Sequence, residues 1–232
     1  MLEDKIKTVQ EKIAAALAKR QEPKITGTQV TLVAVTKNHG PEVITEALAA
    51  GLVNIGENRV QEAKHKQEVL PSGGIWHLIG HLQTNKARQA VAHFDMIESV
   101  DSLRLLELLN SEAERIGKVQ DILLQLNIAH EEQKTGFARQ EYLELLPQIP
   151  QYEHVRVRGL MVIAPAAEDL ETVRPVFAAG YRCFCRLQEQ YPKVDCLSMG
   201  MSHDYPVAIE EGANMVRVGT ALFGPRDYSL KF

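Results

Sequence analysis

Hydrophobic positions along the chain follow two different periods. In residues 2–20 they recur close to every 3.6 residues, the period of an amphipathic helix, at Ile6, Val9, Ile13, Ala16 and Leu17. From residue 30 onward, short apolar runs rich in β-branched residues alternate with segments that have helical periodicity. The pattern therefore predicts one leading helix followed by a repeated strand–helix unit.

Eight strands are expected in the repeated part. They lie at 30–36, 53–57, 75–80, 96–100, 121–127, 157–163, 196–200 and 215–219, with helices near 41–50, 59–69, 84–92, 102–118, 139–149, 169–190 and 204–212. Strands that alternate with helices pair in parallel through right-handed crossovers. Eight of them in 232 residues favour an α/β fold, a single-domain (β/α)8 TIM barrel over residues 1–232 with an additional N-terminal helix, rather than an open doubly wound sheet.

Composition and charge narrow the class of protein. The chain is 45% hydrophobic and 24% charged, which is typical of a soluble globular protein with a large core. Its formal net charge of −4 offers no general attraction for nucleic acid or for an anionic membrane, so a small-molecule ligand is favoured. The first 20 residues are charged throughout, unlike a secretory signal, and no segment reaches the ~20 apolar residues of a membrane helix. A cytoplasmic protein is therefore expected.

Residues that could bind a metal do not form a recognisable site. Cys183 and Cys185 are two apart and do not face each other on a helix, so these cysteines and Cys196 are expected to be free, partly buried thiols. His77 and His81 are four apart, which would suit a metal on a helix but separates them by ~13 Å on a strand. We expect them to pack in the barrel and to form hydrogen bonds at its rim.

The first predicted strand ends in a lysine. The run TLVAVTKNHG, residues 31–40, places Lys37 at the carboxyl end of a β-branched segment. An unpaired ammonium is costly to bury, so this lysine is solvated, paired or reactive. Taken alone, a solvated lysine is the usual case. Ligands of a TIM barrel bind at the carboxyl ends of its strands, however, and Lys37 belongs to that site if there is one.

Polar and small residues gather at other strand ends. Asn58 follows the second strand, Ser202 follows the seventh, and Gly219 and Thr220 stand at the end of the eighth. Backbone N–H groups and hydroxyls there suit a phosphate, and the phosphate site of many barrels lies in the loops after strands seven and eight. Simpler roles stay open, because glycines often only form turns and Ser202 could cap the next helix.

Arg217 completes a chemical pattern. An arginine between valines on a central strand, as in MVRVG, needs a partner. A reactive lysine after the first strand and a phosphate site near the last suggest a ligand with an aldehyde at one end and a phosphate at the other. Pyridoxal 5′-phosphate (PLP) has both groups. Lys37 would form a Schiff base with its C4′ aldehyde, and Arg217 would face its pyridine nitrogen.

Seven segments of the chain resemble the pyridoxal phosphate homeostasis proteins, single-domain relatives of the barrel domain of bacterial alanine racemase. These segments are LVAVTKN, NIGENRVQEAKHK, WHLIGHLQTNKAR, IESVDS, LLQLNIAHEEQKTGF, GLMVIAP and LSMGMSHDYPVAIEEGANMVRVGTALFG, and they span nearly residues 30–225. The chain departs from the pattern at Thr36, where relatives often have serine, and at Asn38, where many have threonine or valine.

The resemblance implies roles for individual residues and for the protein. Lys37 would carry PLP as a Schiff base, Arg217 would face the pyridine nitrogen, and Asn58 matches a family position close to the cofactor. The phosphate would be held by Ser202, Gly219 and Thr220. The protein would carry and buffer PLP, pass it to PLP-dependent apoenzymes, maintain vitamin B6 and indirectly amino-acid homeostasis, and act as a monomer.

The alternative is a PLP-dependent amino-acid racemase. Racemisation needs an acid or base on each face of the α-carbon, and Lys37 supplies only one. In two-domain racemases a tyrosine from a second domain serves the other face, and we expect no such domain here. Tyr205 is the nearest candidate for the second group. An arginine at the pyridine nitrogen also weakens the ring as an electron sink, which favours the carrier.

Overall fold

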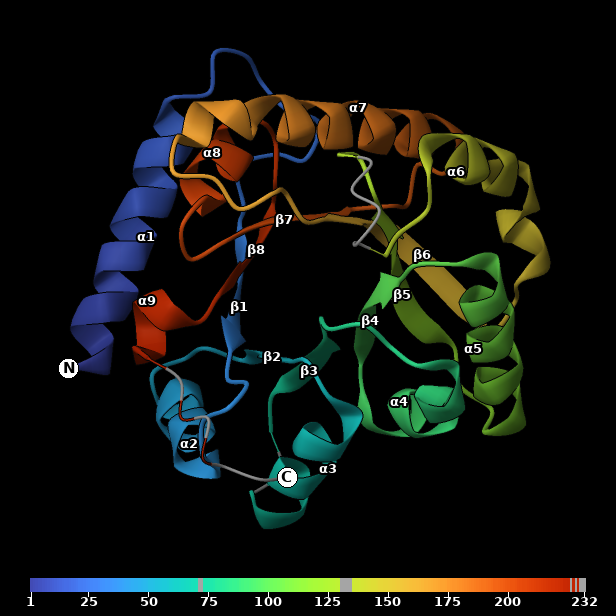
Figure 1. Ribbon diagram of the computed structural model, residues 1–232, viewed down its shortest axis with the longest axis horizontal. Coiled ribbons are helices and arrows are strands. Elements are labelled where there is room, and N and C mark those ends of the chain that lie inside the picture. Colours follow the sequence, from blue (N-terminus) through green and yellow to red (C-terminus); the bar gives the residue numbers. More distant parts are fainter. Residues whose placement is uncertain (71–72, 130–134, 226, 228, 230–232) are drawn as a thin grey trace.

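The computed structural model describes residues 1–70, 73–129, 135–225, 227 and 229, and a closed barrel of eight parallel strands forms its centre (Figure 1). The strands are β1 (Thr31–Val35), β2 (Asn54–Glu57), β3 (Ile75–Leu78), β4 (Met96–Val100), β5 (Gln120–Leu126), β6 (Val155–Val162), β7 (Cys196–Met201) and β8 (Met215–Val218). Each strand pairs with the next, and β8 pairs with β1 to close the barrel. The predicted TIM barrel is therefore confirmed. Residues 130–134, within the similar segment LLQLNIAHEEQKTGF, lie outside the described part of the chain.

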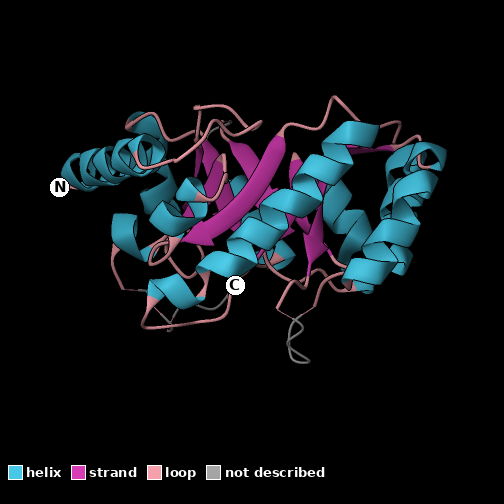
Figure 2. Cartoon of the chain, turned by 90° about the horizontal axis from the view of Figure 1, so that it is seen from above, coloured by secondary structure: helices cyan, strands magenta, loops and turns pink. Residues whose placement is uncertain are grey.

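Helices surround the strands, as Figure 2 shows from above. They are α1 (Leu2–Ala18), α2 (Pro41–Ala49), α3 (Val60–Val69), α4 (Ala87–His93), α5 (Leu103–Arg115), α6 (Arg139–Leu145), α7 (Arg174–Gln190), α8 (Tyr205–Glu210) and α9 (Thr220–Phe223), with 3₁₀ turns η1 (Thr84–Lys86), η2 (Leu146–Gln151) and η3 (Leu170–Thr172). Helix α1 lies outside the barrel against α8 and α9 (Figure 1), which confirms the additional N-terminal helix. In the described residues no helix is both long and apolar enough to span a bilayer.

Proline explains why two of the predicted helices are shorter in the structure. The helix expected at 139–149 ends at Leu145 and continues as the 3₁₀ turn η2, which contains Pro147 and Pro150. Proline has no N–H to donate and clashes with the preceding turn of an α-helix. The helix expected from 169 begins at Arg174, with Pro175 in its first turn, where the missing donor is tolerated.

The barrel wall separates two apolar regions. Inside it, a small cluster consists of Val33, Met96, Leu123, Met161 and Met215. A larger core fills the space between the outer faces of the strands and the helices. Successive strand residues point to opposite sides of the wall, so residues two apart share a side. Arg217 therefore points into the barrel, with Met215, and Glu98 does so with Met96.

Candidate functional site

Lys37 lies two residues beyond Val35, the last residue of β1, at the carboxyl mouth of the barrel, and is half-buried. In the pairing of β1 with β8, Val33 stands opposite Arg217 and Ala34 opposite Val218. The same register brings Gly219 beside Val35, since a Cβ atom at Gly219 would lie only 3.0 Å from the carbonyl oxygen of Val35. The ends of β1 and β8 thus bring Lys37 and Gly219 to the same edge of the mouth.

A hydroxyl and two backbone amides meet beside that edge. The N–H of Gly219 donates to Ser202 Oγ at 3.1 Å, and the N–H of Ala221 donates to the same oxygen at 3.4 Å. Thr220, between them, is exposed at the start of α9. Ser202 therefore does not cap α8, the simpler role left open by the sequence, but joins the loop after β7 to the end of β8. Ser202, Gly219 and Thr220 lie together as predicted.

Arg217 begins a series of hydrogen-bonded side chains inside the barrel. Its Nη1 donates to Ser198 Oγ at 2.5 Å and its Nη2 to the carbonyl of Val162 at 3.1 Å. Ser198 in turn donates to Glu98 Oε2 at 2.6 Å, and Glu98 Oε1 lies 2.8 Å from His77 Nδ1. The partner expected for Arg217 from the sequence is therefore Glu98. The Ser198 hydroxyl bridges the two side chains, and Arg217 Nη1 lies 3.9 Å from Glu98 Oε2.

The charged side chains in this hydrogen-bonded series shift one another's pKa values. Burial lowers the pKa of the Arg217 guanidinium, and the charges of Glu98 and Asp204 oppose that shift. Burial raises the pKa of Glu98, but hydrogen bonds and charges from His77, Arg217 and Ser198 outweigh it, so the pKa lies below its usual value. Glu98 is thus the anion that balances buried Arg217. His77, expected to pack in the barrel, also contacts Asn54 Oδ1 at 3.1 Å, and His81 bonds Asp101 at the rim.

A second cluster of charges lies behind Lys37, between the barrel wall and α3. Lys66 Nζ is 2.6 Å from Glu57 Oε1 and 2.8 Å from Glu62 Oε1, and all three side chains are buried. Burial, with the charge of Glu62, raises the pKa of Glu57 to about 7, against the opposing effect of Lys66. Glu57 Oε2 is buried and has no hydrogen-bond partner among the described residues.

Asn58 and Tyr205 occupy different surroundings. Asn58 is half-buried directly after β2, and its backbone packs so closely on Gly80 that a Cβ there would collide with the Asn58 carbonyl oxygen. Its position at the mouth agrees with the prediction. Tyr205 is 2% exposed and packs in the core outside the barrel wall, and burial raises the pKa of its phenol.

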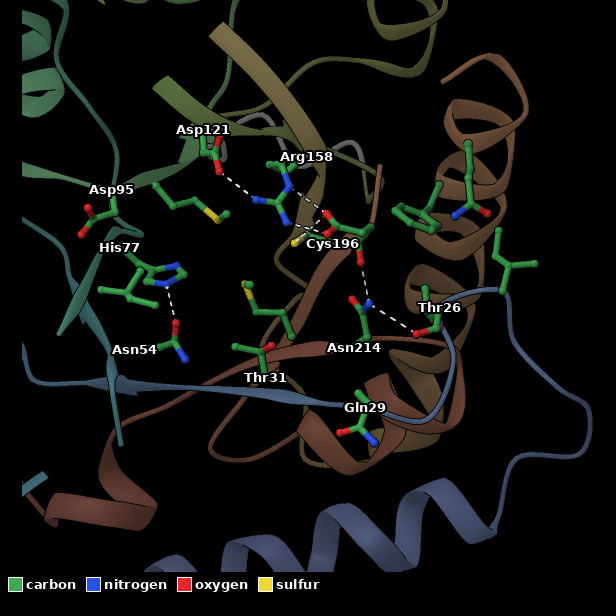
Figure 3. Close-up of a pocket in the computed structure, with 17 residues that line it drawn as sticks. Thr26, Gln29, Thr31, Asn54, His77, Asp95, Asp121, Arg158, Cys196 and Asn214 are labelled. Atoms are coloured by element: carbon green, nitrogen blue, oxygen red, sulfur yellow. Dashed lines mark hydrogen bonds and ion pairs between the residues drawn. The ribbon is translucent and has the colours of Figure 1, made fainter. Parts of the chain in front are cut away.

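A cavity of about 600 Å³ lies at the opposite end of the barrel, among the amino ends of the strands (Figure 3). Thr31, Asn54, Asp121, Cys196 and Asn214 line it at or next to the first residues of their strands. It is therefore separate from the mouth that holds Lys37. Smaller cavities of about 260 and 320 Å³ flank the loop that carries Ser202, the first bordered by α1.

The sequence interpretation missed the charged partners behind the site. Glu98 stands in MIESV, where a carboxylate inside an apolar strand invites the same argument that singled out Arg217. Lys66 and Glu62 are one helical turn apart, a spacing that predicts an ion pair but does not reveal burial. Glu57 ends β2, yet only the three-dimensional packing of α3 on β2 brings it to Lys66.

Comparisons with known proteins agree with this architecture. The family model described as alanine racemase, N-terminal domain, matches residues 14–227. The pyridoxal phosphate homeostasis protein of Escherichia coli strain K12 is 41% identical over 211 residues, 88% of each chain. That of Pasteurella multocida strain Pm70 is 36% identical over 233 residues, covering 98% of this chain and 99% of the relative.

Solved structures are similar over nearly the whole chain. PipY of Synechococcus elongatus PCC7942, solved with PLP bound, is 40% identical with a TM-score of 0.83, covering 97% of this chain and all of its own. An alanine racemase of Clostridium difficile 630, 13% identical with a TM-score of 0.70, covers 95% of this chain and 57% of its own and shows a common fold. The chain therefore belongs to the alanine racemase N-terminal domain family and, within it, to the pyridoxal phosphate homeostasis proteins.

Proposed function

We propose that this protein binds PLP at the carboxyl mouth of its barrel, with Lys37 as the covalent attachment point, and serves as a carrier and buffer of the cofactor. The observation that carries the proposal is the convergence of three groups on the ends of two paired strands. Lys37 follows β1, while buried Arg217 and the amides around Ser202 belong to β8 and its surroundings. The PLP named in the PipY structure supports the same assignment.

The residues present fit a phosphorylated aldehyde. The N–H groups of Gly219 and Ala221 converge on one point, now held by the Ser202 hydroxyl, and the exposed Thr220 adds a hydroxyl beside it. Oriented N–H groups of this kind bind a phosphate oxygen. Gly219 is needed there because a side chain would press on Val35. The aldehyde of PLP reacts with a primary amine to give an imine and water, and Lys37 provides that amine.

Arg217 sets the chemical character of the site. As a guanidinium it donates hydrogen bonds and does not deliver a proton to a pyridine nitrogen at neutral pH. The unprotonated ring then withdraws electrons weakly, which suits retention of the cofactor better than carbanion chemistry. Glu98 keeps Arg217 charged and in place through Ser198. Asn58, at the adjacent strand end, contributes a polar wall to the same mouth.

The proposal extends to the role of the protein in the cell. A bound but reversible aldehyde can be released to PLP-dependent apoenzymes, and the protein would thereby maintain vitamin B6 and indirectly amino-acid homeostasis. We further propose a cytoplasmic monomer. The racemase alternative gains no support from Tyr205, because its ring is buried in the core and burial raises the pKa of the group that would have to donate a proton.

The test is an absorption titration of the purified protein with PLP, with and without borohydride. Wild type is expected to develop the visible band of a protonated Schiff base, which borohydride fixes irreversibly, and Lys37→Ala is expected to lack both. Lys64→Ala, an exposed lysine on α3, is the matched control and should behave as wild type. A wild-type protein without the band at saturating PLP would overturn the proposal, as would a band that survives in Lys37→Ala.

The carrier role requires a second assay. PLP-loaded protein should restore an apo PLP-dependent enzyme when the two are mixed, and borohydride-reduced protein should not. The control is the amount of free PLP that the loaded protein releases into buffer over the same time. If loaded protein restores no more apoenzyme activity than this free PLP, the protein stores PLP and does not deliver it directly.

A further inference from the structure

The buried cluster of Lys66, Glu57 and Glu62 is attached to the backbone on both sides of Lys37. Lys66 Nζ donates to the carbonyl oxygen of Thr36 at 2.8 Å. The N–H of Asn38 donates to Glu62 Oε1 at 2.6 Å. That carbonyl belongs to the peptide unit before Lys37, and that N–H belongs to the peptide unit after it. One ion cluster therefore holds both peptide units that flank the Cα atom of Lys37.

The same cluster also holds the strand end and the turn in place. Thr36 Oγ1 donates to Glu57 Oε1 at 2.6 Å, so Thr36 is tied by its side chain as well as by its carbonyl. Asn38 has a φ of 57°, a left-handed conformation that asparagine tolerates but does not prefer. Its N–H bond to Glu62 helps to hold the chain in that conformation. The direction in which Lys37 leaves the backbone is thus fixed by three buried side chains.

Stability alone does not explain why these charges are buried. Desolvation of an ion pair can exceed its Coulombic gain, and well-packed apolar side chains of similar volume often stabilise a fold as well or better. This cluster also buries two carboxylates against one ammonium and leaves one carboxylate oxygen, Glu57 Oε2, without a hydrogen-bond partner among the described residues. What the cluster provides is defined geometry at Lys37.

We propose that Lys66, Glu57 and Glu62 are positioning residues that hold Lys37 in the orientation in which its amine reacts with the aldehyde of PLP. This inference rests on the proposed function of Lys37. The cluster lies on the outer side of the barrel wall, while the groups proposed to bind phosphate and ring lie at the mouth and inside. Loss of the cluster should therefore weaken the covalent step more than non-covalent recognition.

Two ligands separate these effects. PLP carries the reactive aldehyde, and pyridoxine 5′-phosphate has the same ring and phosphate with an alcohol in its place. In Lys66→Met and Glu62→Ala, the dissociation constant for PLP is expected to rise about tenfold or more, because small misplacements of a reacting group have large effects. The dissociation constant for pyridoxine 5′-phosphate is expected to stay within about twofold of wild type, since a tenfold change would require about 1.4 kcal/mol of lost contacts.

Matched variants on the same helix serve as controls. Lys64 and Glu68 form an exposed pair on α3, with 3.8 Å between Nζ and Oε1, so Lys64→Met and Glu68→Ala should leave the affinity for both ligands unchanged. Glu62→Gln keeps an oxygen that can accept the Asn38 N–H, and it should retain most of the PLP affinity that Glu62→Ala loses. If Lys66→Met does not fold, the comparison of Glu62→Gln with Glu62→Ala decides the matter.

Three results would overturn the inference. The first is a folded Lys66→Met or Glu62→Ala with wild-type affinity for PLP. The second is an equal loss of affinity for both ligands, which would indicate general damage to the mouth. The third is equal behaviour of Glu62→Gln and Glu62→Ala. Failure of wild type to react with PLP at Lys37 would instead refute the proposed function itself.

Discussion

Two clusters of ion-paired side chains lie at opposite ends of the barrel. At the carboxyl end, Lys66 meets Glu57 and Glu62, and the side chains are 0%, 0% and 1% exposed. At the amino end, Arg158 meets Asp121 and Asp195 beside the cavity of Figure 3, and the side chains are 27%, 14% and 54% exposed. In each cluster one cation contacts two carboxylates, but the amino-end cluster also includes Arg156 and is far more exposed to water.

Burial changes what each cluster can do. Water screens the pairs of Arg158, and exposed pairs contribute little to folding. Arg158 also shares Asp121 with Arg156, so its loss leaves that carboxylate a partner. Water does not reach Lys66 or its partners. Removal of one member of a buried ion pair leaves an uncompensated charge. Loss of one charged side chain should therefore destabilise the fold strongly at the cluster behind Lys37 and only weakly at the cluster around Arg158.

The largest expected effect is the removal of the buried cation. Lys66→Met should lower the free energy of unfolding at pH 7 by about 3–5 kcal/mol, since buried Glu62 then loses its countercharge and Glu57, whose pKa is already about 7, must take up a proton. Urea unfolding followed by circular dichroism measures it. Lys64→Met is the control and should change the free energy by less than about 0.5 kcal/mol. Equal effects of the two variants would contradict the account.

The pH dependence of the buried cluster should be visible in Glu57→Gln. The folded-state pKa of Glu57 is raised from 4.5 to about 7, so between these values the native state holds a proton that the unfolded chain has lost. This contribution makes wild type less stable as pH rises through that window, by up to about 3 kcal/mol relative to Glu57→Gln. Unfolding free energies of both proteins from about pH 4 to about pH 8 test it. A difference that stays constant with pH would count against the shift.

Inside the barrel, Glu98→Gln should have an intermediate effect. The amide keeps the shape of Glu98 but removes the negative charge that faces Arg217 and His77. Loss of hydrogen bonds to charged groups is expected to lower the free energy of unfolding by about 2 kcal/mol. Glu107→Gln on the exposed side of α5 provides the control, measured in the same urea titration. An unchanged stability would mean that Arg217 does not depend on Glu98.

The smallest effect is expected at the amino end. Arg158→Met should lower the free energy of unfolding by about 1 kcal/mol or less, and added salt should shrink the difference further. The affinity for PLP should be unchanged, because Arg158 lies at the other end of the barrel. A loss comparable with that of Lys66→Met would show that exposure does not distinguish the two clusters.

Features that depend on local sequence patterns could be predicted, whereas features that depend on contacts between distant residues could not. Hydrophobic periodicity predicted all eight strands and the leading helix, because both depend on local patterns of burial. Strand ends placed Lys37, Ser202 and Gly219 at one mouth, since a parallel barrel gathers all its carboxyl ends there. The roles of these residues and of Asn58, Arg217 and Thr220 stay predictions.

Other features depend on contacts that no local pattern encodes. The bonds between Lys66 and Thr36 and between Asn38 and Glu62 join residues 30 and 24 positions apart, because α3 packs on β2 and on the residues that follow β1. The chain from Arg217 to Glu98 crosses the barrel interior between strands that do not neighbour each other. The end of α6 at Leu145 and the start of α7 at Arg174 also differ from the predicted positions, because nearby prolines outweigh an otherwise helical pattern.

The site at which PLP attaches can be found by mass spectrometry. The protein is saturated with PLP, reduced with borohydride, digested and analysed by mass spectrometry, with Lys37→Ala treated in parallel. We expect one stoichiometric pyridoxyl-phosphate adduct in wild type, on the peptide that carries Lys37, and no stoichiometric adduct in the variant. An adduct on a different lysine, retained in Lys37→Ala, would contradict it.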